Sequence, residues 1–234
     1  MPSYPFPAIW VGGDLGPFRH CDSTYGRYDL ASLPRLPDDE FDGSYSWLRR
    51  HPSPLEYDER FARAWGDNGA VAWAAEAERA RPELIGSAQA AGVNIPDEFL
   101  TFILDPTLVT MLRSPSDCYF RLSPHLVPGG GPAGGSFVHF LSDSQNCYEW
   151  YVFLAPGGGH CVVASDDDLA DPTHPIGLWA DERERIVCCA PSFEPFVYRL
   201  WIENESWFRL VIKDQPLTVE MRSYLDGSRG SRDT

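Results

Sequence analysis

The feature that most constrains the fold is a set of short runs, rich in aromatic and β-branched residues, in the second half of the chain. They cover 118–122, 136–141, 147–154 and 160–164. This composition is typical of β-strands. Linkers of hairpin length join the last three runs, so the pattern predicts an antiparallel meander, with 184–190 as a candidate for one more strand. Because nearly every position is apolar, both faces of the central strands should be covered.

Helical patterns come before the predicted sheet. Residues 57–92 are rich in alanine and predict a helical region with interruptions at 66–69 and at Pro82. A further helix should begin around 94–98. It should end before Pro106, because the residue that precedes a proline avoids helical backbone angles. A short helix is expected directly after that proline.

A long helix is predicted after the sheet. From Phe193 to Val211 the large apolar residues recur with a period close to 3.6 residues. Ser192 is a suitable N-cap, and Glu194 and Pro195 suit the first helical turn. The whole order predicts an α+β fold, with N-terminal helices, an antiparallel β meander of four to six strands and a long C-terminal amphipathic helix.

The same patterns predict how the chain is divided. Residues 1–56 are rich in proline, glycine and aromatic residues and lack a sustained period, so they are expected to form an irregular extension packed on the main domain. Residues 57–225 are predicted to be a single α+β domain. Residues 226–234 are glycine or polar residues, which predicts a disordered tail.

The charge of the chain limits its partners. It has 19 basic and 34 acidic residues and a formal net charge of −15. Nucleic acids and anionic membranes need a cationic surface, so both are disfavoured, whereas a basic protein partner is favoured. The acidity is equally compatible with a role in solubility alone. The N-terminal residues do not resemble a signal peptide, so the protein is expected to be cytoplasmic with reduced cysteines.

Two short segments resemble a known family. Residues 95–102, IPDEFLTF, and 192–196, SFEPF, are similar to motifs of the SUKH superfamily, which includes a yeast regulator of cell-wall assembly and many bacterial immunity proteins. The resemblance covers roughly 70–212. It implies a non-enzymatic module that binds a protein, typically a toxin, by direct contact. It brings no catalytic residue and no cofactor.

Candidate partner-binding residues lie in and beside the predicted sheet. An acidic loop follows the fourth run, and aromatic residues of the third run are of the kind enriched at contact hot spots. The loop lacks the spacing of a calcium-binding loop, so no metal site is assigned. The candidate partner-binding residues are Asp166, Asp167, Asp168, Asp171, Tyr148 and Trp150.

Two other functions remain open at this stage. A small hydrolase-like enzyme would need a thiol activated by an imidazole, and Cys118 with His139, or His160 beside Cys161, are the available pairs. A regulatory or structural subunit of a larger assembly would use residues 1–56 as a docking arm. The stretch 129–134 matches G-x-G-x-x-G, but it precedes a predicted strand, which favours a flexible loop over a phosphate site.

Overall fold

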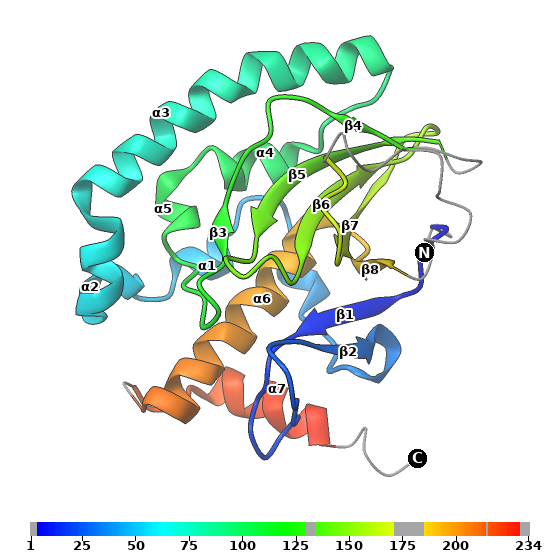
Figure 1. Cartoon of the computed structure of the whole chain (residues 1–234). Coiled ribbons are helices and arrows are strands. Elements are labelled where there is room, and N and C mark those ends of the chain that lie inside the picture. The colour runs from blue at the N-terminus through cyan, green and yellow to red at the C-terminus, as the bar shows by residue number, and fades with distance from the viewer. Residues whose placement is uncertain (1–3, 130–133, 171–184, 214, 230–234) are drawn as a thin grey trace.

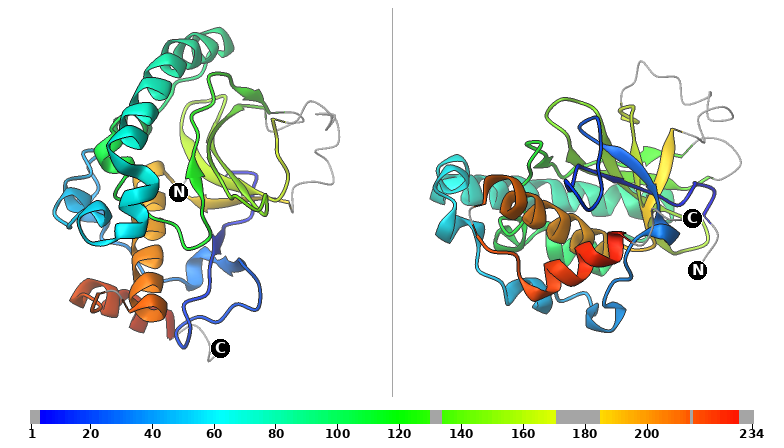
Figure 2. Two further views of the ribbon diagram at one scale, coloured as in Figure 1. Left: turned by 60° about the vertical axis from the view of Figure 1, so that its left-hand side comes forward. Right: turned by 90° about the horizontal axis from the view of Figure 1, so that it is seen from below.

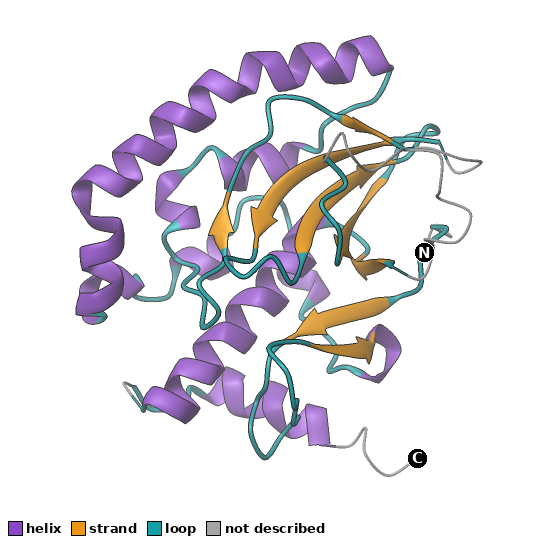
Figure 3. Ribbon diagram, viewed as in Figure 1, coloured by secondary structure: helices purple, strands orange, loops and turns teal. Residues whose placement is uncertain are grey.

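The computed structural model describes residues 4–129, 134–170, 185–213 and 215–229 (Figure 1). They form an α+β fold in which helices cover one face of an antiparallel sheet, as Figures 2 and 3 show. The predicted fold class is therefore confirmed. The helices are α1 (Ser46–Arg49), α2 (Pro54–Tyr57), α3 (Glu59–Ala91), α4 (Asp97–Ile103), α5 (Pro106–Val109), α6 (Phe193–Trp207) and α7 (Val219–Arg229).

The main sheet is an antiparallel meander. Its strands follow the order β3-β5-β6-β7-β8, and β4 also pairs with β5. Every residue of β5 and β6 is buried, so both faces of the centre are covered, as the apolar runs predict. The strands of this sheet are β3 (Tyr119–Phe120), β4 (Val127–Pro128), β5 (Ser136–Ser142), β6 (Glu149–Leu154), β7 (His160–Ser165) and β8 (Ile186–Ala190).

Helix α3 is continuous, and the predicted interruptions at 66–69 and Pro82 are wrong. Asp58 accepts hydrogen bonds from the backbone N–H groups of Arg60 and Phe61 at its start, and Gly92 ends it in a left-handed conformation. Its buried residues recur every three or four positions along one face, which packs on the core. This packing outweighs the local cost of an internal proline. The buried face consists of Trp73, Ala77, Ala80, Leu84 and Ala88.

The first 56 residues contain regular elements that the sequence pattern does not predict. Strands β1 (Ile9–Gly12) and β2 (Gly26–Asp29) pair in an antiparallel hairpin that lies beside β8. Ala8, which precedes β1, makes a parallel bridge with Cys188 of β8. The side chains of Trp10 and Trp47 are about 1% exposed. This segment therefore contributes to the core, although its sequence lacks any sustained period.

The C-terminal region also differs from expectation. Helix α6 ends at Trp207, and a π-helical turn, Phe208–Ile212, follows it. Helix α7 extends to Arg229, so residues 226–229 are helical rather than part of a disordered tail, because the α7 residues Met221, Tyr224 and Leu225 are buried against the core. Residues 230–234 lie outside the described part. None of the described helices is both long and apolar enough to cross a bilayer.

Candidate functional site

The predicted acidic loop is largely neutralised by its own neighbours. Arg185 contacts the carboxylates of Asp166 and Asp167 at 3.2 and 2.6 Å. Asp168 accepts a hydrogen bond from the Tyr151 hydroxyl at 3.0 Å. Asp171 lies outside the described residues. The described carboxylates thus order the loop internally, which reduces what they offer to a partner.

The predicted aromatic pair is not presented as a surface. Trp150 is 2% exposed, and its ring lies edge-on to Tyr25 with centroids 5.8 Å apart. Tyr148 is half-buried, and its ring packs on the ring of Tyr25 with centroids 5.5 Å apart. Trp150 points into the core on the helix-covered face of the sheet, so its prediction as a contact residue is wrong for this conformation.

The candidate thiol Cys118 has no imidazole beside it among the described residues. Its sulfur lies 3.1 Å from the Tyr25 hydroxyl and 3.4 Å from the Ser116 hydroxyl. Burial raises the pKa of the Cys118 thiol, which disfavours the thiolate that nucleophilic catalysis requires. The structure therefore does not assemble the predicted Cys118–His139 pair.

His139 belongs to a buried polar cluster instead. Its Nε2 atom lies 2.7 Å from a carboxylate oxygen of Glu149 and 3.1 Å from the Ser142 hydroxyl. A hydrolytic triad needs the acid and the nucleophile on different ring nitrogens, whereas here both contact the same one. Less than a tenth of each of the three residues is exposed, so this cluster stabilises the sheet and does not face a substrate.

The second candidate pair, His160 and Cys161, is separated by the geometry of β7. Cys161 is buried on the face of the sheet away from the main helical core. The His160 Nε2 atom instead lies 2.6 Å from the Glu98 carboxylate. Neighbouring residues of a strand point to opposite faces, so the structure does not assemble this pair either.

The side chain of Glu98, which belongs to α4, caps the N-terminus of helix α6. Its carboxylate accepts hydrogen bonds from the backbone N–H groups of Phe193 and Glu194 at 2.8 and 3.1 Å. Ser192 stands at the N-cap position but makes no side-chain cap, so the predicted capping role of Ser192 is wrong. A negative charge at this position also complements the helix dipole. A residue of the first family-like segment, 95–102, thus caps the helix that begins in the second, 192–196.

An acidic cleft surrounds this junction. We use the term for the cavity of about 530 Å³ between α4, the start of α6 and residues 41–43. The side chains that line it include four carboxylates and no cationic group. Asp42 and Asp97 are exposed, Glu98 is partly buried and Glu194 is buried. The four acidic residues of the cleft are Asp42, Asp97, Glu98 and Glu194.

The deepest carboxylate of the cleft is already held in place. Glu194 accepts hydrogen bonds from the Gly43 N–H at 2.6 Å and from the Trp47 indole N–H at 2.8 Å. Burial raises the pKa of Glu194, and the charges of Glu98 and Asp42 add to that increase. The Asp97 carboxylate has no hydrogen-bond or ion-pair partner among the described residues. The outer rim of the cleft therefore carries negative charge that is free to meet a cation.

Glu98→Gln should destabilise the protein by about 1–2 kcal/mol at neutral pH, because it removes a charged helix cap and an ion pair. Burial alone would raise the pKa of Glu98, but the hydrogen bonds from His160, Phe193 and Glu194 lower it overall. A lowered folded-state pKa adds stability above the unfolded value, and this stability is lost as pH falls through the folded value. Urea unfolding at pH 7 and pH 3 should show the difference between wild type and variant shrinking in acid; an equal difference at both pH values would contradict this role.

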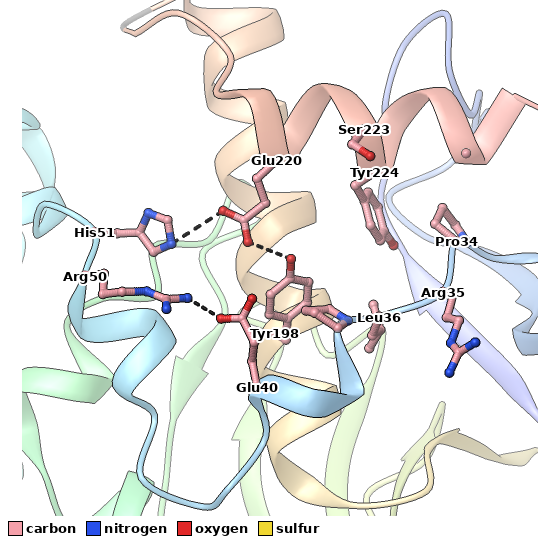
Figure 4. Close-up of a pocket in the computed structure, with 12 residues that line it drawn as sticks. Pro34, Arg35, Leu36, Glu40, Arg50, His51, Tyr198, Glu220, Ser223 and Tyr224 are labelled. Atoms are coloured by element: carbon pink, nitrogen blue, oxygen red, sulfur yellow. Dashed lines mark hydrogen bonds and ion pairs between the residues drawn. The ribbon is translucent and has the colours of Figure 1, made fainter.

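A second, larger cavity is lined by residues that directly precede the segment 41–43 in the chain (Figure 4). It has a volume of about 690 Å³ and lies between residues 34–40, the end of α1, α6 and α7. Glu220 of α7 contacts the imidazole of His51 at 3.6 Å and accepts a hydrogen bond from the Tyr198 hydroxyl at 2.7 Å. Arg50 pairs with Glu40 in the same wall, as the dashed lines in Figure 4 mark.

The two cavities differ in the balance of charged side chains in their linings. In the larger one, two arginines, Arg35 and Arg50, and two glutamates, Glu40 and Glu220, belong to the lining, so the charges largely cancel. In the acidic cleft, no cationic residue belongs to the lining, and two carboxylates are exposed at the rim. Electrostatics therefore favours the acidic cleft as the place where an external cationic group would be attracted.

The sequence gives only an indirect signal of this cleft. Asp97, Glu98 and Glu194 are recognisable as acidic residues in first helical turns. Nothing local indicates that α4 and α6 start side by side, or that residues 41–43 close the space between them. In the described part of the chain, no group of three or more histidine, cysteine or acidic side chains is arranged to hold a metal ion.

Comparisons with known proteins do not identify the chain. No family model matches it, and neither the curated proteins nor the solved structures searched give a match. The resemblance to the SUKH superfamily therefore stays a prediction from the two short segments.

Proposed function

We propose that this chain is a protein-binding module that acts by direct contact with a basic protein partner, in the manner of SUKH-type immunity proteins. The observation that carries the proposal is the acidic cleft, in which four carboxylates line one cavity without a cationic neighbour in its wall. Its position supports the proposal too, because the cleft lies where the two family-like segments meet.

The chemistry of such a contact follows from the charges. An arginine or lysine of the partner would enter between the exposed Asp42 and Asp97. Asp42 accepts its hydrogen bonds from Ser44 through Oδ1 alone, and Asp97 has no side-chain partner among the described residues. Complementary fields mainly accelerate encounter and select the partner, and close charge pairs at an interface contribute about 1.5–7 kcal/mol. The net charge of −15 acts in the same direction over longer distances.

The double variant Asp42→Asn/Asp97→Asn should weaken binding to the partner at least about tenfold, or about 1.4 kcal/mol. The partner is first isolated with the wild-type chain, identified, and purified, and affinities are then measured by calorimetry at two salt concentrations. Asparagine keeps the Ser44 contacts of residue 42, so the fold should be retained. The affinity of the variant should also depend less steeply on salt.

A matched control changes the net charge equally at a remote place. Glu76→Gln/Glu78→Gln removes two exposed carboxylates from α3, neither of which lines the cleft. This control should bind within about twofold of wild type, since general attraction is only a small part of affinity. If both double variants lost affinity equally, the effect would be one of general charge and would contradict the role of the cleft. A partner without a basic surface would also refute the proposal.

A further inference from the structure

The face of the sheet away from the main helical core carries an apolar cluster of its own. We call this face the outer face; its buried residues include Phe137 of β5, Phe153 of β6 and Val163 of β7. Part of its cover comes from residues 4–8, which lie far from these strands in sequence. The partly buried residues that pack against the cluster are Tyr4, Phe6, Ala155 and Leu169.

Two aromatic rings anchor residues 4–8 on the outer face. The ring of Phe6 lies edge-on to Phe153 with centroids 5.0 Å apart, and its centroid is 6.2 Å from that of Phe137. The ring of Tyr4 is also edge-on to Phe153, at 6.3 Å, and its hydroxyl donates a hydrogen bond to the carbonyl of His160. Ring pairs at such separations contribute about 0.5–1.5 kcal/mol each beyond the area that they bury. The anchors therefore stand two residues apart in the sequence.

The backbone of this segment is attached at one end only. The Pro7 carbonyl accepts a hydrogen bond from the Cys188 N–H at 2.8 Å, and the Ala8 carbonyl accepts one from the Leu30 N–H at 3.1 Å. Within the described part of the chain, residues 4–6 make no backbone hydrogen bond to the sheet. Pro7 has no N–H to donate, so the segment cannot extend a strand ladder. A segment held by two rings and so few backbone bonds opens locally at low cost.

We propose that the outer face is a peptide-binding surface, which residues 4–8 occupy within the chain and which accepts a similar segment of another protein in their place. The bound segment defines the chemistry of that partner. It has an aromatic ring, a second ring two residues later, and a carbonyl that reaches the N–H of Cys188. Prolines beside the rings restrict the backbone before binding, which lowers the entropy lost on docking.

The chain's own segment competes with the partner. A tethered ligand has an effective concentration in the millimolar range, so an external segment has to bind more tightly to displace residues 4–8. The displaced segment, Tyr-Pro-Phe-Pro-Ala, carries no charged side chain. Binding at the outer face should therefore depend little on salt. None of the residues that line the acidic cleft belongs to this surface, so the two proposals stand or fall separately.

The experiment titrates the full-length protein with a capped synthetic peptide of the sequence of residues 4–8, followed by NMR. The full-length variant Tyr4→Ala/Phe6→Ala should bind this peptide at least about tenfold more tightly than wild type, because its own segment no longer competes. The shifted resonances should include Phe137, Phe153 and Cys188. Equal affinities for wild type and variant would overturn the proposal, as would shifts that avoid these residues.

Two controls test whether the rings are what the surface recognises. The peptide with Tyr4→Ala and Phe6→Ala should bind neither protein, since it lacks both anchors. The protein variant Tyr119→Ala removes a ring that is 46% exposed on β3 and lies outside the cluster, so it should bind the peptide as weakly as wild type. Binding of the ring-free peptide to the Tyr4→Ala/Phe6→Ala protein would contradict the proposed recognition.

Amide exchange in the wild-type protein tests the proposal without any variant. The Cys188 N–H has the Pro7 carbonyl as its acceptor, so opening of residues 4–8 is enough to expose it. It should exchange at least about tenfold faster than the N–H groups of the central strand β6, which are exposed only by opening of the sheet. If the Cys188 N–H exchanges as slowly as those of β6, residues 4–8 are a fixed part of the fold and the proposal is wrong.

Discussion

Glu203→Ala should destabilise the protein by about 3–5 kcal/mol, because it leaves a buried guanidinium without its counter-ion. The Glu203 carboxylate accepts hydrogen bonds from both terminal nitrogens of Arg19, at 2.7 and 2.5 Å. It also accepts from the Trp10 indole N–H at 2.8 Å and from the Tyr224 hydroxyl at 2.6 Å. One side chain of α6 thus holds β1, the loop that follows it and α7.

The measurement is denaturant unfolding, combined with hydrogen exchange of the backbone. Loss of protection should concentrate in residues 9–30 and in α7, the segments that Glu203 joins to α6. Glu78→Ala is the matched control, because its carboxylate is 63% exposed and lies 4.0 Å from Arg81. That control should change stability by no more than about 0.5 kcal/mol. Similar losses in both variants would refute the role given to Glu203.

The same network predicts a dependence on pH. Burial alone would raise the pKa of Glu203, but the charge of Arg19 and its hydrogen bonds lower it overall. A lowered pKa means that the contribution is complete above the unfolded value and is lost as pH falls through the folded value. Wild type should therefore lose more stability than Glu203→Ala as pH falls below about 4.5, the ordinary value for this group.

The parts of the fold that the sequence predicts are those specified by local patterns. The meander follows from apolar runs and hairpin-length linkers, and α4 and α6 follow from periodicity and first-turn residues. Residues 1–56 follow no such pattern. They are held by single contacts over long distances in sequence, such as Trp10 with Glu203 and Trp47 with Glu194. Such contacts leave no periodic signal in either partner.

Helix α6 shows why the candidate site was harder to predict than the fold. Glu194, Glu203 and Glu205 are charged residues of this helix, yet all three are buried. The first 56 residues, together with Arg113 and α7, supply donors for these carboxylates. The acidic cleft is a consequence of this arrangement, since it forms only where residues 41–43 meet the helix.

Arg113→Ala should destabilise the protein by about 3–5 kcal/mol, because it removes the cation that joins Asp58 to the buried Glu205 and leaves Glu205 only the more distant Arg209, at 3.5 Å. Arg113 is 2% exposed. It contacts Glu205 at 2.7 Å and Asp58 at 2.9 Å, and its guanidinium lies 3.9 Å from the centre of the Phe208 ring. Since Asp58 also caps α3, the first turns of α3 should lose protection from hydrogen exchange.

Two further substitutions separate the geometry of this contact from its charge. Arg113→Lys keeps the charge but cannot span both carboxylates with a planar fork, so its loss should lie between wild type and Arg113→Ala. Arg185→Ala removes an exposed arginine that also contacts two carboxylates, at 3.2 and 2.6 Å. Its side chain is 46% exposed, so the loss should not exceed about 1 kcal/mol. Equal losses for Arg113→Ala and Arg185→Ala in urea unfolding would show that burial is not what makes the Arg113 contact strong.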